Sequence, residues 1–144
     1  MGKKLENLAI VAVLAVVYFG TAKLGLRFAF VNPSATALWA PTGITLAAFL
    51  TFGFRVWPGA FLGAFFANLT TAGSVLTSIG IATGNTLEGV VGCYLVGRFA
   101  RGPQAFERAQ DIFKFAFLAG MLSTAISATV GVTSLSLGGF AAWT

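Results

Sequence analysis

One stretch decides the class of this protein: residues 56–97, VWPGAFLGAFFANLTTAGSVLTSIGIATGNTLEGVVGCYLVG, contain a single charged side chain, Glu88. The same apolar character extends outward from it, because hydrophobic residues make up 57% of the 144-residue chain and charged residues only 9%. An average soluble domain carries about 25% charged residues. So few charges cannot hydrate the surface of a soluble domain of this size. The sequence therefore predicts an integral membrane protein.

The composition also excludes several functional classes. With no histidine and one cysteine, Cys93, the chain lacks the residues for a disulfide framework, a zinc finger or a haem-attachment motif. No glycine precedes a Lys-Ser or Lys-Thr pair, so there is no phosphate-binding loop. The net charge of +5 is too scattered to form a nucleic-acid-binding patch. We therefore expect no enzymatic activity, no metal, no cofactor and no nucleic-acid partner.

Charged residues and turn residues divide the chain into five apolar segments, which predict helices over about residues 8–30, 35–54, 58–71, 74–98 and 111–137. A short amphipathic piece is expected over residues 104–110. The third segment is short, since its rise of 1.5 Å per residue covers only about 20 Å of a roughly 30 Å hydrocarbon core. Lys3-Lys4 and the apolar run behind them imitate a signal peptide, but four apolar segments would remain after cleavage. The sequence predicts one all-α domain over residues 1–144, a bundle of about five membrane-crossing helices.

The basic residues predict the orientation of this bundle. If the third segment crosses, the N-terminus, the turn at Arg55 and the loop over residues 98–114 share one side, and only Lys23 and Arg27 lie opposite. That side then holds Lys3, Lys4, Arg55, Arg98, Arg101, Arg108 and Lys114. Cytoplasmic loops carry an excess of Lys and Arg, so we predict a cytoplasmic N-terminus.

Glu88, in the middle of the fourth segment, is the main candidate for a functional residue. An ionised carboxylate inside a membrane costs several kcal/mol unless it is paired, so Glu88 should be neutral, hydrogen-bonded or partnered. Asn85 lies three residues earlier and therefore on the same helix face, and Asn68 lies near the end of the third segment. These three residues predict either a polar, proton-sensitive sensing pocket or a hydrogen-bonded clamp between helices. Both interpretations stay open.

Small residues recur at a spacing of four, which allows close contact between helices in a membrane. These pairs are Gly59 and Gly63, Ala60 and Ala64, Gly80 and Gly84, and Ala116 and Gly120. We expect them to pack helices within the chain, with a dimer interface as the alternative.

From about residue 30 onward, several blocks together resemble the bacterial MASE1 membrane-associated sensor domain. They are WAPTGI (39–44), FGFRVWPG (52–59), FLGAF (61–65) with Asn68, GNTLEG (84–89) and SATVG (127–131). The positions that carry the motifs and the packing are Trp39, Pro41, Gly43, Arg55, Trp57, Pro58, Gly59 and Gly63. One difference is Ala40, where the family more often has a second proline.

The resemblance implies a sensory input domain without enzymatic activity in the bacterial inner membrane. Such domains are usually joined to histidine kinases of two-component systems or to cyclic-di-GMP enzymes, and they are about twice as long. By this resemblance the chain corresponds to the N-terminal part of the domain. We therefore expect missing C-terminal helices, another membrane protein or a second copy of the chain to complete the bundle in the lipid bilayer.

The mechanism implied is a change in the packing of the second to fourth helices. A small-molecule stimulus or a membrane state would bias that packing at Asn68, Asn85 and Glu88, and the turn Arg55-Val56-Trp57-Pro58 would relay it. A hypothesis from another class is a small proton-coupled secondary transporter, or half of one, that uses Glu88.

Overall fold

The computed structural model describes residues 2–28, 39–71 and 74–141, and within these ranges its regular elements are all helices. The four N-terminal helices are α1 (Lys3–Leu26), α2 (Ala40–Phe52), α3 (Trp57–Leu69) and α4 (Val75–Phe99). Two short 3-10 turns, η1 (Phe54–Val56) and η2 (Gly102–Gln104), follow α2 and α4. The C-terminal part is one long helix made of α5 (Ala109–Phe117), a π-helical segment η3 (Leu118–Ser123) and α6 (Thr124–Leu137). The predicted all-α class is confirmed.

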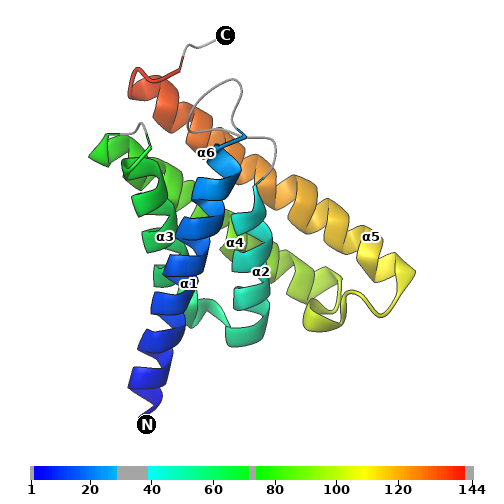
Figure 1. Cartoon of the computed structure of the whole chain (residues 1–144). Helices are drawn as coiled ribbons and strands as arrows, with labels where there is room; N and C mark the ends of the chain where they lie inside the picture. The colour runs from blue at the N-terminus through cyan, green and yellow to red at the C-terminus, as the bar shows by residue number, and fades with distance from the viewer. Residues whose placement is uncertain (1, 29–38, 72–73, 142–144) are drawn as a thin grey trace.

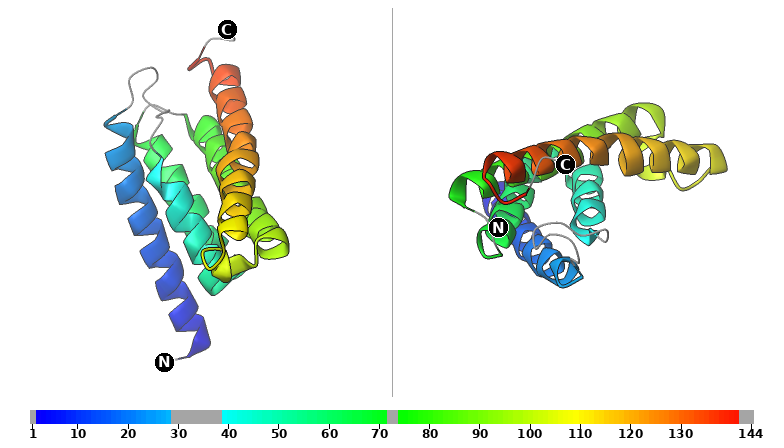
Figure 2. Two further views of the ribbon diagram at one scale, coloured as in Figure 1. Left: turned by 90° about the vertical axis from the view of Figure 1, so that its right-hand side faces the viewer. Right: turned by 90° about the horizontal axis from the view of Figure 1, so that it is seen from above.

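The helix α4 lies at the centre of the bundle (Figure 1). It packs against α3, α2 and α6, while α1 packs mainly against α3 and less extensively against α2. Successive helices run in opposite directions, so the start of α1 and the end of α6 lie at opposite ends of the molecule (Figure 2). This alternation is the one that the predicted five segments require.

Two of the helices are shorter than the others. The helices α1, α4 and the continuous α5–α6 helix are long and apolar enough to cross a membrane. In contrast, α2 and α3 have 13 residues each and so span about 20 Å. The sequence predicted a short third helix, but it predicted a longer second one, over residues 35–54. The observed α2 begins at Ala40, with Pro41 in its first turn, and residues 35–38 lie outside the described part of the chain.

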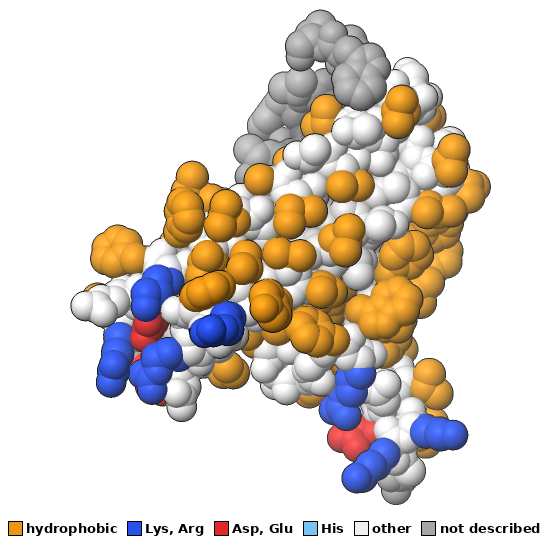
Figure 3. All heavy atoms as spheres, turned by 180° about the vertical axis from the view of Figure 1, so that it is seen from behind, with side chains coloured by type: hydrophobic (Ala, Val, Ile, Leu, Met, Phe, Trp, Pro, Cys, Tyr) orange, Lys and Arg blue, Asp and Glu red, His pale blue; other side chains and the backbone are white. Residues whose placement is uncertain are grey.

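The basic side chains gather at one end of the molecule, below a broad apolar band (Figure 3). This end contains the start of α1, the turn at Arg55 and the connection from α4 to α5. Lys23 lies toward the other end, where its Nζ donates to Thr70 O at 3.0 Å and to Thr71 Oγ1 at 2.9 Å. A cation stabilises the C-terminus of a helix, so Lys23 ties the end of α1 to the end of α3.

The short amphipathic piece predicted over residues 104–110 is mostly not helical. The segment between η2 and α5 consists of turns and bends, and α5 begins only at Ala109. Arg101 and Gly102 have φ angles of 61° and 60°, in the left-handed region. Two consecutive left-handed residues end α4 and turn the chain back toward α5.

Most of the small-residue pairs pack helices within the chain, as predicted. A Cβ atom added at Gly63 would lie 2.6 Å from Tyr18 Cβ and 2.9 Å from Ala15 O, so α1 and α3 are in backbone contact there. Gly84 approaches Val130 of α6 in the same way. Ala116 and Gly120 differ, because both are exposed.

Candidate functional site

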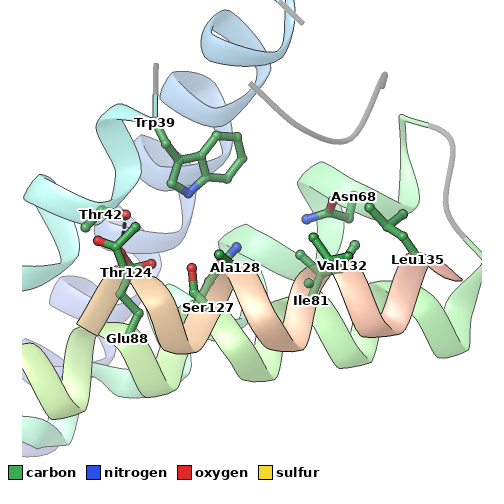
Figure 4. Close-up of a pocket in the computed structure, with 12 residues that line it drawn as sticks. Trp39, Thr42, Asn68, Ile81, Glu88, Thr124, Ser127, Ala128, Val132 and Leu135 are labelled. Carbon is green, nitrogen blue, oxygen red and sulfur yellow. Dashed lines mark hydrogen bonds between the residues drawn. The ribbon is translucent and has the colours of Figure 1, made fainter. Parts of the chain in front are cut away.

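A pocket of about 250 Å³ lies between α2, α3, α4 and α6 (Figure 4). Its lining comes from the start of α2, the end of α3 and one face each of α4 and α6: Trp39, Thr42, Asn68, Ile81, Asn85, Glu88, Thr124, Ser127, Ala128, Gly131, Val132 and Leu135. The three predicted site residues, Asn68, Asn85 and Glu88, therefore meet in one pocket, although they come from two helices. Among the described residues, the lining contains one acidic residue and no basic residue.

Glu88 joins three helices at one end of this pocket. Its side chain is only 2% exposed, and its Oε1 accepts hydrogen bonds from Thr124 Oγ1 at 2.8 Å and from Thr42 Oγ1 at 3.2 Å. These bonds link α4 to α6 and to the first turn of α2. Glu88 thus has the contacts expected of a clamp and the position expected of a pocket residue.

The carboxylate of Glu88 is buried without a compensating cation in the described part of the chain. The ion pairs found there, Arg101–Glu107 at 3.9 Å and Lys114–Asp111 at 3.6 Å, both lie in the connection from α4 to α5 or in the first turns of α5. A buried charge that has hydroxyl donors but no opposite charge keeps much of its desolvation cost. Glu88 is therefore the polar group of the pocket with the largest uncompensated desolvation cost. No cluster of His, Cys, Asp and Glu among the described residues is arranged to hold a metal ion.

The π-helical segment η3 ends immediately before Thr124. Such segments are rare and occur frequently at functional sites, because they change which face a helix presents. The hydroxyl of Thr124 also lies 3.2 Å from Ala119 O, the carbonyl five residues earlier. From Thr124 onward, the pocket residues of α6 follow the spacing of a single helical face, at positions 124, 127, 128, 131, 132 and 135. The end of η3 thus coincides with the start of the face that covers the pocket.

Asn68 lies at the other end of the pocket. Its side chain is 1% exposed, and its Nδ2 donates to Ala64 O at 2.9 Å. Because a backbone carbonyl can only accept, this bond fixes the orientation of the amide. Asn68 Oδ1 then has no hydrogen-bond partner among the described residues. Native proteins rarely leave such an atom unsatisfied, but Asn68 Oδ1 is buried behind the pocket wall and is not accessible from the pocket.

The family-motif positions fall into three groups. At the pocket, Trp39 lines the wall and packs edge-on against Tyr18, with ring centroids 6.4 Å apart, while Pro41 is buried in the first turn of α2. At the basic end, Arg55 lies exposed in η1, and Trp57 and Pro58 begin α3.

The remaining motif positions are glycines. Gly59 and Gly63 contact α1, whereas a Cβ atom on Gly43 would meet nothing within 4 Å. The structure gives no packing reason for Gly43.

Sequence reasoning missed three polar residues of the pocket: Thr42, Thr124 and Ser127. Two of them lie in blocks that carry the family resemblance, WAPTGI and SATVG. Thr124 lies three residues before Ser127 and so on the same helix face. The motif blocks therefore contained a signal for two of the three.

This arrangement defines the class of protein: a helical membrane domain with a mostly apolar pocket beside a buried carboxyl group. The sequence model of the MASE1 family matches residues 9–142, which is most of the chain. The chain belongs to the MASE1 family, whose members are membrane-associated sensory domains of signalling proteins and are not catalytic. No curated protein and no solved structure matches it.

Proposed function

We propose that this chain is the sensory input unit of a bacterial signalling protein and that the pocket around Glu88 detects the stimulus. The observation that carries the proposal is the buried Glu88 carboxylate, which faces the pocket and is joined by hydroxyl groups to α2 and α6. A sensor requires two packing arrangements whose balance a stimulus can shift through its different affinity for each. Glu88 is well placed to couple such a shift to three helices at once.

The proposed mechanism is competition for the carboxylate. A stimulus that contacts Glu88 competes with the hydroxyls of Thr42 and Thr124, so α2 or α6 is released from α4. A movement of α2 passes through Gly53 and η1 into α3, because only one residue separates α2 from η1. The Arg55 turn at the basic end is then the relay to the output.

In this proposal the domain lies in the bacterial inner membrane with five helices running across and its N-terminus in the cytoplasm. The gathering of basic residues at the end that holds the N-terminus supports this orientation. The output is a histidine kinase or a cyclic-di-GMP enzyme module. Further helices, another membrane protein or a second copy of the chain complete the bundle.

The test is Glu88→Gln in the assembled sensor, with its output module present. Glutamine keeps the size of the side chain and its Oε1 acceptor but removes the charge, so we expect normal insertion and an altered response to stimulus and to pH. The matched control is Glu107→Gln, since Glu107 is exposed and its contact with Arg101 is 3.9 Å long. If Glu88→Gln signals like the parent at every pH while both variants fold, the pocket does not sense and the clamp role remains.

A second candidate function is proton-coupled transport, because acidic residues at the middle of a membrane helix mark such pathways. Glu88 lies near the centre of α4 and at the pocket wall. Uptake into proteoliposomes that is driven by a pH gradient and abolished by Glu88→Gln would favour transport. Signalling by the assembled protein without such uptake would favour the sensor.

A further inference from the structure

We propose that the surface over residues 98–114, which joins the end of α4 to the start of α5, binds the phosphate group of an anionic phospholipid through Arg98 and Arg108. This inference goes beyond the proposed function. It concerns a surface that the proposed mechanism does not use, and it does not depend on the pocket.

The lengths of two helices place the 98–114 surface at the level of the lipid head groups. The helix α4 has 25 residues and the continuous helix over residues 109–137 has 29, so they are about 37 and 43 Å long. A hydrocarbon core of about 30 Å cannot cover either helix fully. Residues 115–137 contain no charged side chain and, at about 34 Å, are long enough to cross the core. The start of α5 therefore lies outside the core, at the basic end of the molecule below the apolar band (Figure 3).

Positive charge is in excess on the 98–114 surface. Four cations are exposed there: Arg98, Arg101, Arg108 and Lys114. Of the two acids, Asp111 is only 5% exposed and lies 3.6 Å from Lys114, while Glu107 is exposed and lies 3.9 Å from Arg101. Arg98 and Arg108 form no ion pair with any described residue. These two guanidinium groups are therefore available to an anion from outside the chain.

Exposed aromatic rings lie next to both arginines in the sequence. The Arg98 guanidinium lies 5.4 Å from the centre of the Phe99 ring. Phe106 lies two residues before Arg108 and packs against Phe115 of α5, with ring centroids 4.8 Å apart. Phe99 and Phe106 are each more than half exposed. Segments that combine exposed aromatic rings with basic side chains lie in the membrane interface, where the rings reach the acyl chains and the cations meet the head groups.

The guanidinium group favours phosphate as the ligand. It is always charged, and its donors form a planar fork that matches two phosphate oxygens. Phosphatidylglycerol carries this phosphate without a compensating cation, whereas the choline group of phosphatidylcholine offsets the charge. Each basic residue near an anionic membrane surface strengthens binding by about fivefold. Two unpaired arginines therefore favour an anionic phospholipid.

The experiment compares the binding of two short-chain lipids to the purified chain in a neutral detergent, with bound lipids counted by native mass spectrometry. We expect phosphatidylglycerol to bind about tenfold more tightly than phosphatidylcholine with the same acyl chains. Added salt should weaken this preference, because the charges are exposed. Equal affinities for the two lipids would overturn the proposal.

A double variant tests the location of the site. Arg98→Gln with Arg108→Gln should lose the preference for phosphatidylglycerol, at about fivefold for each arginine. The matched control is Lys3→Gln with Lys4→Gln, which removes the same charge at the same end of the molecule and should keep the preference. An equal loss in the two double variants would show that any cation at this end is sufficient, and would overturn the assignment to Arg98 and Arg108.

A conservative variant guards against misfolding. Arg98→Lys with Arg108→Lys keeps both charges but lacks the planar fork, so it should still prefer phosphatidylglycerol to phosphatidylcholine. All of these substitutions change exposed side chains, so each variant should unfold at the same concentration of denaturing detergent as the parent. If a folded variant with both glutamines prefers phosphatidylglycerol as the parent does, the proposal is wrong.

A soluble competitor separates the lipid from a free phosphate compound. Glycerol phosphate carries the same phosphate group without acyl chains, so the exposed rings of Phe99 and Phe106 gain nothing from it. We expect it to displace phosphatidylglycerol only weakly at equal concentration. Displacement as strong as that by phosphatidylglycerol itself would identify a soluble phosphate compound as the ligand and overturn the assignment to a lipid.

Discussion

Both sides of the bundle contain close glycine contacts, Gly63 with Tyr18 on one and Gly84 with Val130 on the other, but only one side holds the pocket beside Glu88. On one side α1 and α3 meet through glycine and alanine, with Gly59 and Gly63 against the backbone of α1 and with Ala60 and Ala64 fully buried. On the other side α4 meets α2 and α6 around a pocket, with Glu88 held by threonine hydroxyls. The first contact leaves no room for another atom, whereas the second leaves space for a small molecule.

This difference indicates which side can change its packing. Close contact through small residues gains its stability from dispersion, and any separation of the helices loses it at once. A contact made by hydroxyl groups and a carboxylate around a cavity can exchange partners with a ligand or with water. We therefore regard α1–α3 as the rigid frame and the α2–α4–α6 side as the responsive part.

The largest effect on stability is expected for Gly63→Ala in the frame. The new methyl group would lie 2.6 Å from Tyr18 Cβ and 2.9 Å from Ala15 O, so α1 and α3 must separate. Overpacking of this kind typically costs about 1–3 kcal/mol of unfolding free energy. The measurement is unfolding of the chain in mixed micelles with increasing denaturing detergent.

The control is Gly20→Ala in α1, where an added Cβ would meet nothing within 4 Å. Alanine is a better helix former than glycine, so this variant should gain about 0.5–1 kcal/mol. Equal responses of the two variants would show that α1 and α3 are not in close contact.

A smaller effect, about 1 kcal/mol, is expected for Thr124→Val on the pocket side. Valine keeps the shape of threonine but removes the 2.8 Å hydrogen bond to Glu88, and interhelical bonds in membrane proteins contribute at most about 1–2 kcal/mol. Thr129→Val on the same helix is the control, because Thr129 Oγ1 donates to Ala125 O of its own helix at 2.7 Å and to no other described residue. The same unfolding assay should separate the two, and a loss in Thr129→Val as large as that in Thr124→Val would remove the case for a special bond at Glu88.

Much of the fold could be predicted because the membrane leaves few choices to an apolar chain. The lengths of the apolar segments and the places of the charges predicted five antiparallel helices, with a short third one. The path of the connection between α4 and α5 could not be predicted in the same way. Its path depends on two left-handed residues, Arg101 and Gly102, and arginine carries no strong preference for that conformation.

The pocket could be predicted only in part. Asn68, Asn85 and Glu88 stood out because each is polar within an apolar segment. Thr42 and Thr124 did not, because threonine usually satisfies its hydroxyl on a carbonyl of its own helix, as Thr51 and Thr83 do here. The block WAPTGI drew attention to Thr42, but it did not show that the hydroxyl reaches a neighbouring helix, and Thr124 lies in none of the blocks.

The smallest effect is expected outside both sides, at Gly120→Ala. Gly120 and Ala116 have the same four-residue spacing as the glycines of the frame, but both are exposed, and an added Cβ at Gly120 would meet nothing within 4 Å. We therefore expect the unfolding free energy to change by less than about 0.5 kcal/mol and the oligomeric state in detergent to stay the same. A change of oligomeric state, measured by light scattering and enhanced in Gly120→Leu, would show instead that this pair joins two copies of the chain. The four-residue spacing of Ala116 and Gly120 would then mark a contact between two chains. The bundle would have a third kind of packing face, which is completed only in the oligomer.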